Sequence, residues 1–417
     1  MRDARLPLVR LIVSALAVFG LLAVTVPADA AIDSVVLVSS PNTSPNEPNQ
    51  LNAVSCVSES WCIAVGYAIT TARQPIAEIW DGTNWTMQIV PSPSPTLNSK
   101  LNGISCTSTT SCIAVGGAYS GGVWSTLVEK WDGSSWSIET SANSAPTESN
   151  VLNAVSCVSA SFCVLVGHYV NSSYQTLIEV WDGSAAVMQT SANTSPSEDN
   201  ILNGVSCLSA TSCVAVGYHS NGSVAQTLSE SWNGSVWSID LSASVPSSTQ
   251  QILNGVSCTS ATSCFAVGLY FDGSVYLPLI EMWDGSSWSV QALPLVSANG
   301  GFTPAVSCVS ATSCVVTGST IDGGFVRGTL VATWDGSAWS VVTSPNGPGG
   351  GNNFVNGVSC ASAWSCVGVG SFYDGNNDQT LVLSLSGPVP PTTTIPTTSS
   401  TTSSSSGSEP VVPAFTG

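Results

Sequence analysis

The sequence predicts an all-β protein, a seven-bladed β-propeller of four-stranded antiparallel blades, closed by an N-terminal strand that completes the last blade. Three observations predict this fold. A cysteine pair recurs every 50 to 52 residues, each repeat holds four strand-like segments, and the two chain ends complement each other. The cysteine pairs are Cys56/Cys62, Cys106/Cys112, Cys157/Cys163, Cys207/Cys213, Cys258/Cys264, Cys308/Cys314 and Cys360/Cys366.

Each repeat divides into segments a, b, c and d. In the fourth copy these are ILNGVSC, SCVAVGYH, AQTLSESWNG and VWSIDLS, rich in Val, Ile, Trp or Thr and bounded by Gly, Ser, Asn or Asp. Small residues suit segment a as a crowded innermost strand, and tryptophan suits segment d beside a wide outer gap. A β-solenoid and a tandem array of small domains are the alternatives. Solenoid repeats are usually shorter, and a lone domain of about 50 residues buries little core.

The two ends of the array predict how the ring closes. The seventh copy ends with TLVLSLSG at Gly387 and lacks both the WDGSxW turn and segment d. The stretch before the first copy, DSVVLVSSPNTSPNEPNQLN, matches WTMQIVPSPSPTLNSKLN, which follows the turn in the first copy. We therefore expect residues 34–39 to supply the missing strand and to remove the open edges of the ring.

The cysteines predict one disulfide within each repeat. The two cysteines of a copy flank a short turn, as in VSCTSATSC, and would face each other across a hairpin. Zinc sites favour tighter spacings and usually use histidine, but the chain holds only His168 and His219. Disulfides persist in oxidising compartments, which agrees with export.

The chain ends predict an exported protein in three parts. Residues 1–30 resemble a signal peptide, with a basic start, an apolar run from Leu11 to Val26 and a cleavage site after Ala30; a membrane anchor is the alternative. The propeller spans residues 31–387, and the Pro/Ser/Thr-rich tail spans 388–417. The terminal PAFTG resembles a cell-wall sorting motif with Pro413 in place of Leu, so wall association through the tail is a further prediction.

The charge balance limits the partners. Signal cleavage removes three of the seven basic residues and two of the 25 acidic ones, which leaves 23 acids against Arg73, Lys100, Lys130 and Arg327. Such a chain repels phosphate backbones and anionic membrane surfaces. We expect no nucleic-acid partner, no membrane insertion after signal cleavage, a monomer, and a neutral rather than an anionic ligand.

The blades resemble kelch repeats and, more loosely, Asp-box (BNR-like) repeats. In the fourth copy Gly217 matches the first kelch glycine, Trp232 and Asn233 match Tyr-Asp, and Trp237 matches the later Trp. Other copies give Trp80, Asp81 and Trp85; Trp131, Asp132 and Trp136; Trp283, Asp284 and Trp288; Trp334, Asp335 and Trp339. The second kelch glycine is usually absent, and Ala186 replaces the later Trp in the third copy. The resemblance covers about residues 31–388 and implies a fold, not an activity.

No catalytic, metal or cofactor site is predicted. The repeated WDGSxW is typical of a hairpin turn whose tryptophans pack between blades. Two mature arginines are too few for a sialidase-like cluster, and copper chemistry would need more than His168 and His219 with their neighbouring tyrosines. The loop carboxylates Asp272, Asp322 and Asp374 leave a carbohydrate-active enzyme as an alternative function.

The aromatic residues predict a binding face. All eight tyrosines fall between the end of segment b and the core of segment c, and in a propeller the b–c loops share one face. The candidate ligand-binding residues are Tyr67, Tyr119, Trp124, Tyr169, Tyr174, Tyr218, His219, Tyr270, Phe271, Tyr276 and Tyr373. The pairs Tyr218–His219 and Tyr270–Phe271 are the preferred anchors for an extracellular glycan or protein. Alternatively, these aromatics only end strand b or pack on neighbours, as in an envelope scaffold or spacer.

Overall fold

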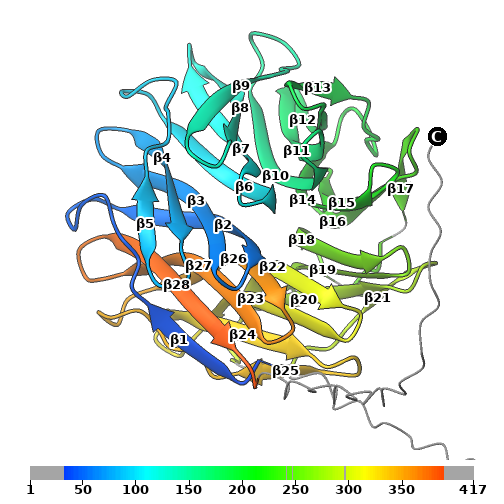
Figure 1. Ribbon diagram of the computed structural model, residues 1–417. Helices are drawn as coiled ribbons and strands as arrows, with labels where there is room; N and C mark the ends of the chain where they lie inside the picture. Colours follow the sequence, from blue (N-terminus) through cyan, green and yellow to red (C-terminus); the bar gives the residue numbers. More distant parts are fainter. Residues whose placement is uncertain (1–31, 241, 247, 295–296, 389–417) are drawn as a thin grey trace, which may run out of the picture.

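The computed structural model describes residues 32–388 except 241, 247, 295 and 296. These residues form 28 β-strands in four-stranded antiparallel sheets around a common centre (Figure 1). The predicted all-β fold and β-propeller architecture are confirmed at this level. The predicted signal peptide, and the predicted tail apart from Pro388, lie outside the described residues. No helix in the described part of the chain is long and apolar enough to span a bilayer.

Segments a and b form the two inner strands of each blade. The a strands are β2 (Asn49–Ser58), β6 (Ser99–Ser108), β10 (Asn150–Ser159), β14 (Asp199–Ser209), β18 (Gln251–Ser260), β22 (Gly301–Ser310) and β26 (Asn353–Ser362). The b strands are β3 (Trp61–Ile69), β7 (Ser111–Ser120), β11 (Phe162–Asn171), β15 (Ser212–Ser220), β19 (Ser263–Phe271), β23 (Ser313–Ile321) and β27 (Ser365–Tyr373). We number the blades 1 to 7 in this order.

Segments c and d form the two outer strands. The c strands are β4 (Arg73–Trp80), β8 (Val123–Trp131), β12 (Ser173–Trp181), β16 (Ala225–Trp232), β20 (Tyr276–Trp283), β24 (Arg327–Trp334) and β28 (Asp378–Ser386). The d strands are β5 (Trp85–Gln88), β9 (Trp136–Ser141), β13 (Ala185–Gln189), β17 (Trp237–Asp240), β21 (Trp288–Val290), β25 (Trp339–Val342) and, in blade 7, β1 (Ser34–Val38).

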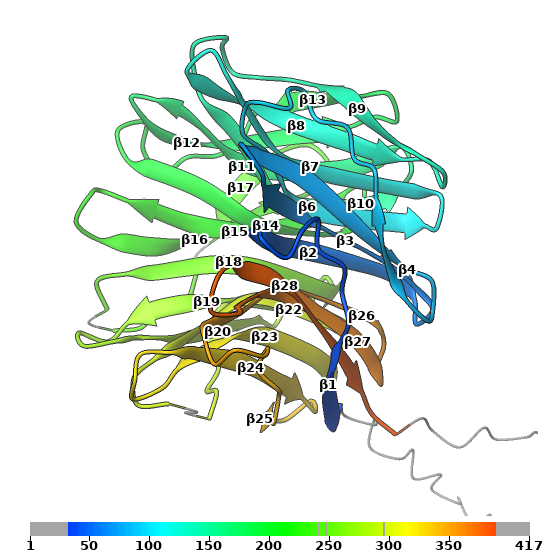
Figure 2. The same cartoon turned by 90° about the vertical axis from the view of Figure 1, so that its left-hand side faces the viewer.

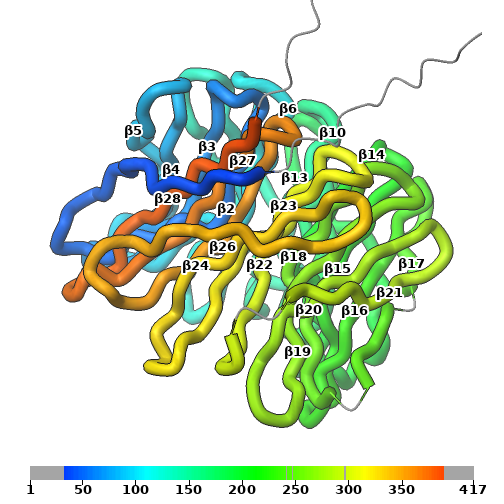
Figure 3. The backbone as a smooth tube through the Cα atoms, turned by 90° about the horizontal axis from the view of Figure 1, so that it is seen from below, coloured from blue at the N-terminus to red at the C-terminus, as the bar shows by residue number. Residues whose placement is uncertain are grey.

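Two strand pairings join parts of the chain that the repeat does not join. β1 runs antiparallel to β28, with Ser34 opposite Ser386 and Val38 opposite Val382, and the two strands lie side by side (Figures 2 and 3). β13 pairs in parallel with β9, and this pairing merges blades 2 and 3 into one eight-stranded sheet. The first pairing places the predicted N-terminal segment in the position that the seventh copy lacks.

The innermost strands line a central channel of about 170 Å³. In blades 1 to 4 and 7, an asparagine at this level donates its Nδ2–H to a backbone carbonyl of the next blade, at 2.7 to 3.0 Å. The residue after it is Gly or Ala, because the strands approach closely. A Cβ added to Gly204 would lie 2.9 Å from the Cα of Gly255. The recurring Asn-Gly/Ala pair is therefore an element of ring packing.

The serine and the cysteine of the VSC motif form a hydrogen bond between each pair of neighbouring blades. In every blade the first cysteine's backbone N–H donates to the serine Oγ of the preceding blade, at 3.0 Å. Cys56 bonds Ser359 in this way, so blades 1 and 7 are joined by the same contact as the other neighbours.

A buried carboxyl on the c strands of blades 1 to 5 was not predicted from the sequence. Glu78, Glu129, Glu179, Glu230 and Glu281 are all 0% exposed. A serine hydroxyl at the end of the preceding blade's outer strand donates to four of them, at 2.7 to 3.0 Å, but neither Oε of Glu129 has a hydrogen-bond partner. Burial raises the pKa of Glu129 to about 9, of Glu78 to about 8 and of the other three to about 7.

Candidate functional site on the loop face

The two ends of the propeller differ in their connections. One end, the turn face, carries the a–b turns and the WDG c–d turns. The other end, the loop face, carries the b–c loops and the connections from strand d to the next strand a.

On the turn face, the Asp of each WDG turn stabilises its own hairpin. Oδ1 of the five aspartates, and of Asn233 in blade 4, accepts the backbone N–H groups two and three residues later, at 2.8 to 3.1 Å. The following glycine has φ between 92° and 101°, a conformation that other residues rarely adopt. These hydrogen bonds hold the pKa of each aspartate below its usual value. The motif is structural, as its repetition indicates.

The cysteine turns also form their covalent and hydrogen bonds within their own blade. The seven predicted disulfides are all present, each within one repeat. In blades 1 to 6, the indole N–H of the WDG tryptophan donates to a backbone carbonyl of the cysteine turn beside it, at 3.0 to 3.2 Å. The recurring polar groups of the turn face therefore form hydrogen bonds with the turns of that face.

The second cysteine of each disulfide is a core residue. Although both cysteines flank an exposed turn, the second one begins the buried stretch of strand b and packs in a hydrophobic cluster shared by two neighbouring blades. These side chains are at most 3% exposed: Cys62, Cys112, Cys163, Cys213, Cys264, Cys314 and Cys366. Each disulfide therefore braces its own hairpin, and its second cysteine fills the core between neighbouring blades.

The loop carboxylates proposed for an enzyme also serve turns. Oδ1 of Asp272, Asp322 and Asp374 each accepts two backbone N–H groups of its own b–c loop, at 2.7 to 2.9 Å. Their positions are explained without a reacting group. Within the described residues, no three His, Cys, Asp or Glu side chains are grouped to hold a metal.

The predicted aromatic residues lie on the loop face, but they are spread over separate blades. Aromatic pairs within a blade are Tyr119–Trp124, His168–Tyr174 and Phe271–Tyr276, with ring centroids 5.1 to 5.6 Å apart. The hydroxyl of Tyr67 donates to Gln50, that of Tyr276 to Gln250 and that of Tyr373 to the Gly375 carbonyl. Tyr169 and Tyr270 pack against core clusters. The aromatics thus share a face without forming a single cluster.

Strand geometry separates the two residues of each preferred anchor pair. Successive side chains of a strand point to opposite sides, so Tyr218 and His219 cannot act together on one ligand surface. The same holds for Tyr270 and Phe271. Register also shows that His168 corresponds to Tyr218 rather than to His219, because His168 lies opposite Val151 and Tyr218 opposite Ile201. The two histidines therefore do not occupy equivalent places.

An Asn–Thr hydrogen bond holds the d–a connection on the c strand in four blades. The asparagine Oδ1 of the connection accepts the backbone N–H of a c-strand threonine, at 2.8 to 3.0 Å. The pairs are Asn143/Thr126, Asn193/Thr176, Asn346/Thr329 and Asn42/Thr380. The equivalent residues are Ser92 and Pro75 in blade 1, Ser244 and Thr227 in blade 4, and Pro294 and Pro278 in blade 5. Proline has no N–H to donate.

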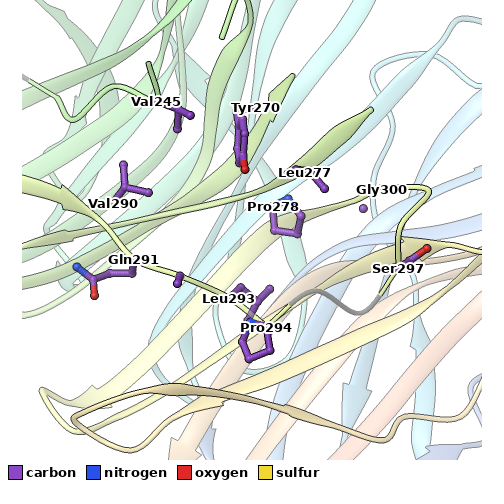
Figure 4. Close-up of a pocket in the computed structure, with 12 residues that line it drawn as sticks. Val245, Tyr270, Leu277, Pro278, Val290, Gln291, Leu293, Pro294, Ser297 and Gly300 are labelled. Carbon is purple, nitrogen blue, oxygen red and sulfur yellow. The ribbon is translucent and has the colours of Figure 1, made fainter. Parts of the chain in front are cut away.

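Two neighbouring cavities lie at equivalent places in blades 4 and 5, where this bond is missing. The blade 5 cavity, about 360 Å³, is bounded by Tyr270, Pro278, Gln291 and Pro294 (Figure 4). The blade 4 cavity, about 430 Å³, is bounded by His219, Thr227, Asp240 and Ser244.

His219 and Tyr270, one member of each preferred pair, occupy equivalent positions in the two cavities: His219 lies opposite Asn200, and Tyr270 opposite Gln251. In the blade 4 cavity, Nδ1 of His219 lies 3.3 Å from Oε2 of Glu198. Burial raises the pKa of Asp240, and the Ser231 hydroxyl partly offsets that rise. The sequence carried a signal for the missing bond: the loop asparagine stands ten residues before the channel-lining asparagine in blades that have the bond and is replaced in those that lack it.

Comparison with known proteins supports the fold only. The sequence matches no family model and no curated protein. A protein of unknown function from Dyadobacter fermentans has a similar structure, with a TM-score of 0.50 and 9% identity over 86% of this chain and 100% of that one. Sqt1 of Chaetomium thermophilum, solved with the N-terminus of ribosomal protein L10, gives 0.46 and 12% over 87% and 98%. The six-bladed fucose-recognising lectin of Aleuria aurantia gives 0.41 and 12% over 76% and 97%.

Proposed function

We propose that this protein is a secreted binding propeller that recognises an extracellular neutral glycan through the two cavities of blades 4 and 5. His219 and Tyr270 are the proposed anchors. A polypeptide is the alternative ligand. In this proposal the protein is a monomer that has no catalytic activity. Its ring is kelch-like and closed by β1, and its tail associates with the cell wall.

The missing Asn–Thr bonds carry this proposal. Four blades hold the d–a connection on strand c, whereas blades 1, 4 and 5 replace the asparagine and blades 1 and 5 also lack the N–H donor. In blades 4 and 5 a cavity accompanies the loss of the bond. Two adjacent departures from the repeat, each accompanied by a cavity, favour a bound molecule that spans both blades.

The cavity walls suit a sugar. The Tyr270 ring and the prolines offer flat apolar surface, and Gln291, Thr227 and Ser244 offer uncharged hydrogen-bonding groups. The seven disulfides indicate an oxidising, extracellular environment in which glycans are available. The turn-capping role of Asp272, Asp322 and Asp374 supports a function without catalysis.

A substitution that restores the missing bond tests the proposal. The mature protein is first screened on an array of neutral glycans and of peptides, and affinity is then measured for the best glycan. In Ser244→Asn the new amide oxygen can accept the Thr227 N–H and hold the connection over the cavity. We expect affinity to fall about tenfold or more without a lower melting temperature.

The matched control is Asn143→Ser, which removes the same bond in blade 2 and should leave affinity unchanged. Wild-type affinity in Ser244→Asn, or binding confined to peptides, would contradict the proposal.

A further inference from the structure

The few basic residues of this acidic protein are not scattered. The described residues contain Arg73, Lys100, Lys130 and Arg327 as their only lysines and arginines. Lys130 lies on an outer strand over the ring of Trp181. Lys100 lies at the start of an innermost strand, and Arg73 and Arg327 begin c strands and place their guanidinium groups over rings of the inner strands, at the loop-face end of the channel. We call this region the channel mouth.

Register defines the channel mouth. Each a strand contains a buried leucine, valine or threonine. The residue directly before it lies opposite the strand b residue that follows a glycine. In blades 6, 7, 1 and 2 this residue is Phe302, Phe354, Gln50 or Lys100, opposite Ser319, Ser371, Tyr67 and Gly117. In blades 3 to 5 it is Val151, Ile201 or Ile252. The mouth therefore has a polar and aromatic arc and an apolar arc.

The cations belong to the first arc. The Arg327 guanidinium carbon lies 5.0 Å from the ring centroid of Phe302 and 5.3 Å from that of Phe354, so it spans blades 6 and 7. In blade 1 the Arg73 guanidinium carbon lies 5.3 Å from the ring centroid of Tyr67. Lys100 is near enough to Arg73 that, after burial, the arginine's charge lowers the lysine pKa further.

These cations lack acidic partners. The single ion pair within residues 32–388 joins His219 and Glu198, so none of the three has one there. Nε of Arg73, and Nδ1 of His168 beside Lys100, are buried without a hydrogen-bond partner. Buried polar atoms of this kind are rare in folded proteins, and like charges held near one another favour an anion.

One acid does lie near this arc. Asp378 begins the c strand of blade 7, between the blades of Arg327 and Arg73, at the position that the two arginines hold in theirs. It pairs with neither arginine. Burial and the neighbouring Asp374 raise its pKa, which is the opposite of what an adjacent arginine would do.

We propose that the channel mouth binds a carboxylate carried on an apolar body. The carboxylate would contact Arg73 and Lys100, Arg327 on the same arc would add positive charge to the mouth, and the body would lie against Val151 and Ile252. Arginine forks match carboxylate geometry. A monoanion is favoured over a phosphate dianion because the rest of the molecule is strongly acidic and repels the second charge. This site is separate from the cavities of blades 4 and 5 and takes a different ligand.

Calorimetric titration of the mature protein tests the site and distinguishes two sources of the carboxylate. N-acetyl-leucine represents a peptide C-terminus, hexanoate represents a free aliphatic acid, and N-acetyl-leucine amide and inorganic phosphate are the comparison probes. We expect one or both acids to bind, and the amide and phosphate to bind at least about tenfold more weakly.

Single substitutions locate the binding. Arg73→Gln and Lys100→Gln should each weaken binding of the acid about tenfold, Arg327→Gln should weaken it less, and Asp378→Asn should strengthen it. Lys130→Gln makes the same charge change far from the mouth and should have no effect. His219→Ala should also have none, so failure here is distinguishable from failure of the glycan proposal.

Several outcomes would overturn the assignment. They are absence of binding by both acids, equal binding of the amide or of phosphate, and equal losses in Lys130→Gln and Lys100→Gln. If a mouth variant melts at a lower temperature than wild type, the wild-type protein still provides the test. Added salt at about 0.5 M NaCl should weaken binding of the acid to it severalfold, because salt screens the charges. Unchanged affinity in salt would equally overturn the site.

Discussion

The turn face and the loop face are built from the same repeat but use it differently. On the turn face, one set of hydrogen bonds recurs from blade to blade, from the Asp-capped turns to the indole N–H bonds. On the loop face, the corresponding Asn–Thr bond is present in blades 2, 3, 6 and 7 and replaced in blades 1, 4 and 5. In this molecule, repeated polar residues maintain the fold, and two of the three departures from the repeat, in blades 4 and 5, coincide with the candidate cavities.

The largest expected effect is on the stability of the ring, which carries both faces. Deletion of residues 34–39 removes β1 and leaves the backbone of β28 unpaired along a sheet edge. We expect a large fall in melting temperature, or oligomers formed through the exposed edge, by calorimetry and size-exclusion chromatography. Deleting six residues of the Ser/Thr-rich tail is the control. A monomer of wild-type stability would contradict closure of the ring by β1.

A rise in pH should lower the stability of the fold through groups that lie inside the blades and on neither face. The pKa values of the five buried glutamates are raised from the usual 4.5 to between about 7 and about 9. The folded state therefore holds protons that the unfolded chain releases. The stability from these groups is complete below pH 4.5 and is lost as the pH rises to about 9. Thermal melts from about pH 5 to about pH 9 should show falling stability, and a flat or rising profile would be inconsistent with neutral buried carboxyls.

Replacement of two of these glutamates should change the stability of the protein by different, smaller amounts. Glu129 is buried with no partner, whereas Glu179 accepts the Ser141 hydroxyl at 2.7 Å. Glu129→Leu replaces an unpartnered polar group with an apolar one of similar size and should stabilise the protein by about 1–3 kcal/mol. Glu179→Leu leaves a serine hydroxyl without its acceptor and should gain less or lose stability. Denaturant melts at neutral pH measure both, and equal effects would show that the serine bond is irrelevant.

The extent to which the sequence predicts this molecule depends on the range of the interactions. The disulfides and the WDG turns are local, so fixed spacings of Cys56 and Cys62, or of Asp81 and Gly82, predict them. The Ser–Cys bonds between blades, the burial of the glutamates and the side of the strand that His219 faces depend on how the blades pack, which spacing does not show.

Charge illustrates the same limit. Composition counts Glu129 as an anion and four bases as a minor surface feature, which argued for a neutral ligand. The structure buries Glu129 with a raised pKa and brings Arg73 and Lys100 together at the channel mouth. The position of a charge, which the sequence does not give, determines what it can bind.

The central claim is that binding depends on the loop face and folding on the turn face, and two variants of blade 5 test it most directly. Tyr270 lines the cavity on the loop face, and Asp284 caps the turn at the opposite end. For the glycan selected on the array, Tyr270→Ala should weaken binding by at least about 1 kcal/mol, measured at a temperature where the variant is folded, because its ring also packs against a core cluster. Asp284→Ala should lower the melting temperature and leave affinity unchanged. The reverse ranking, with affinity lost in Asp284→Ala and kept in Tyr270→Ala, would contradict the account.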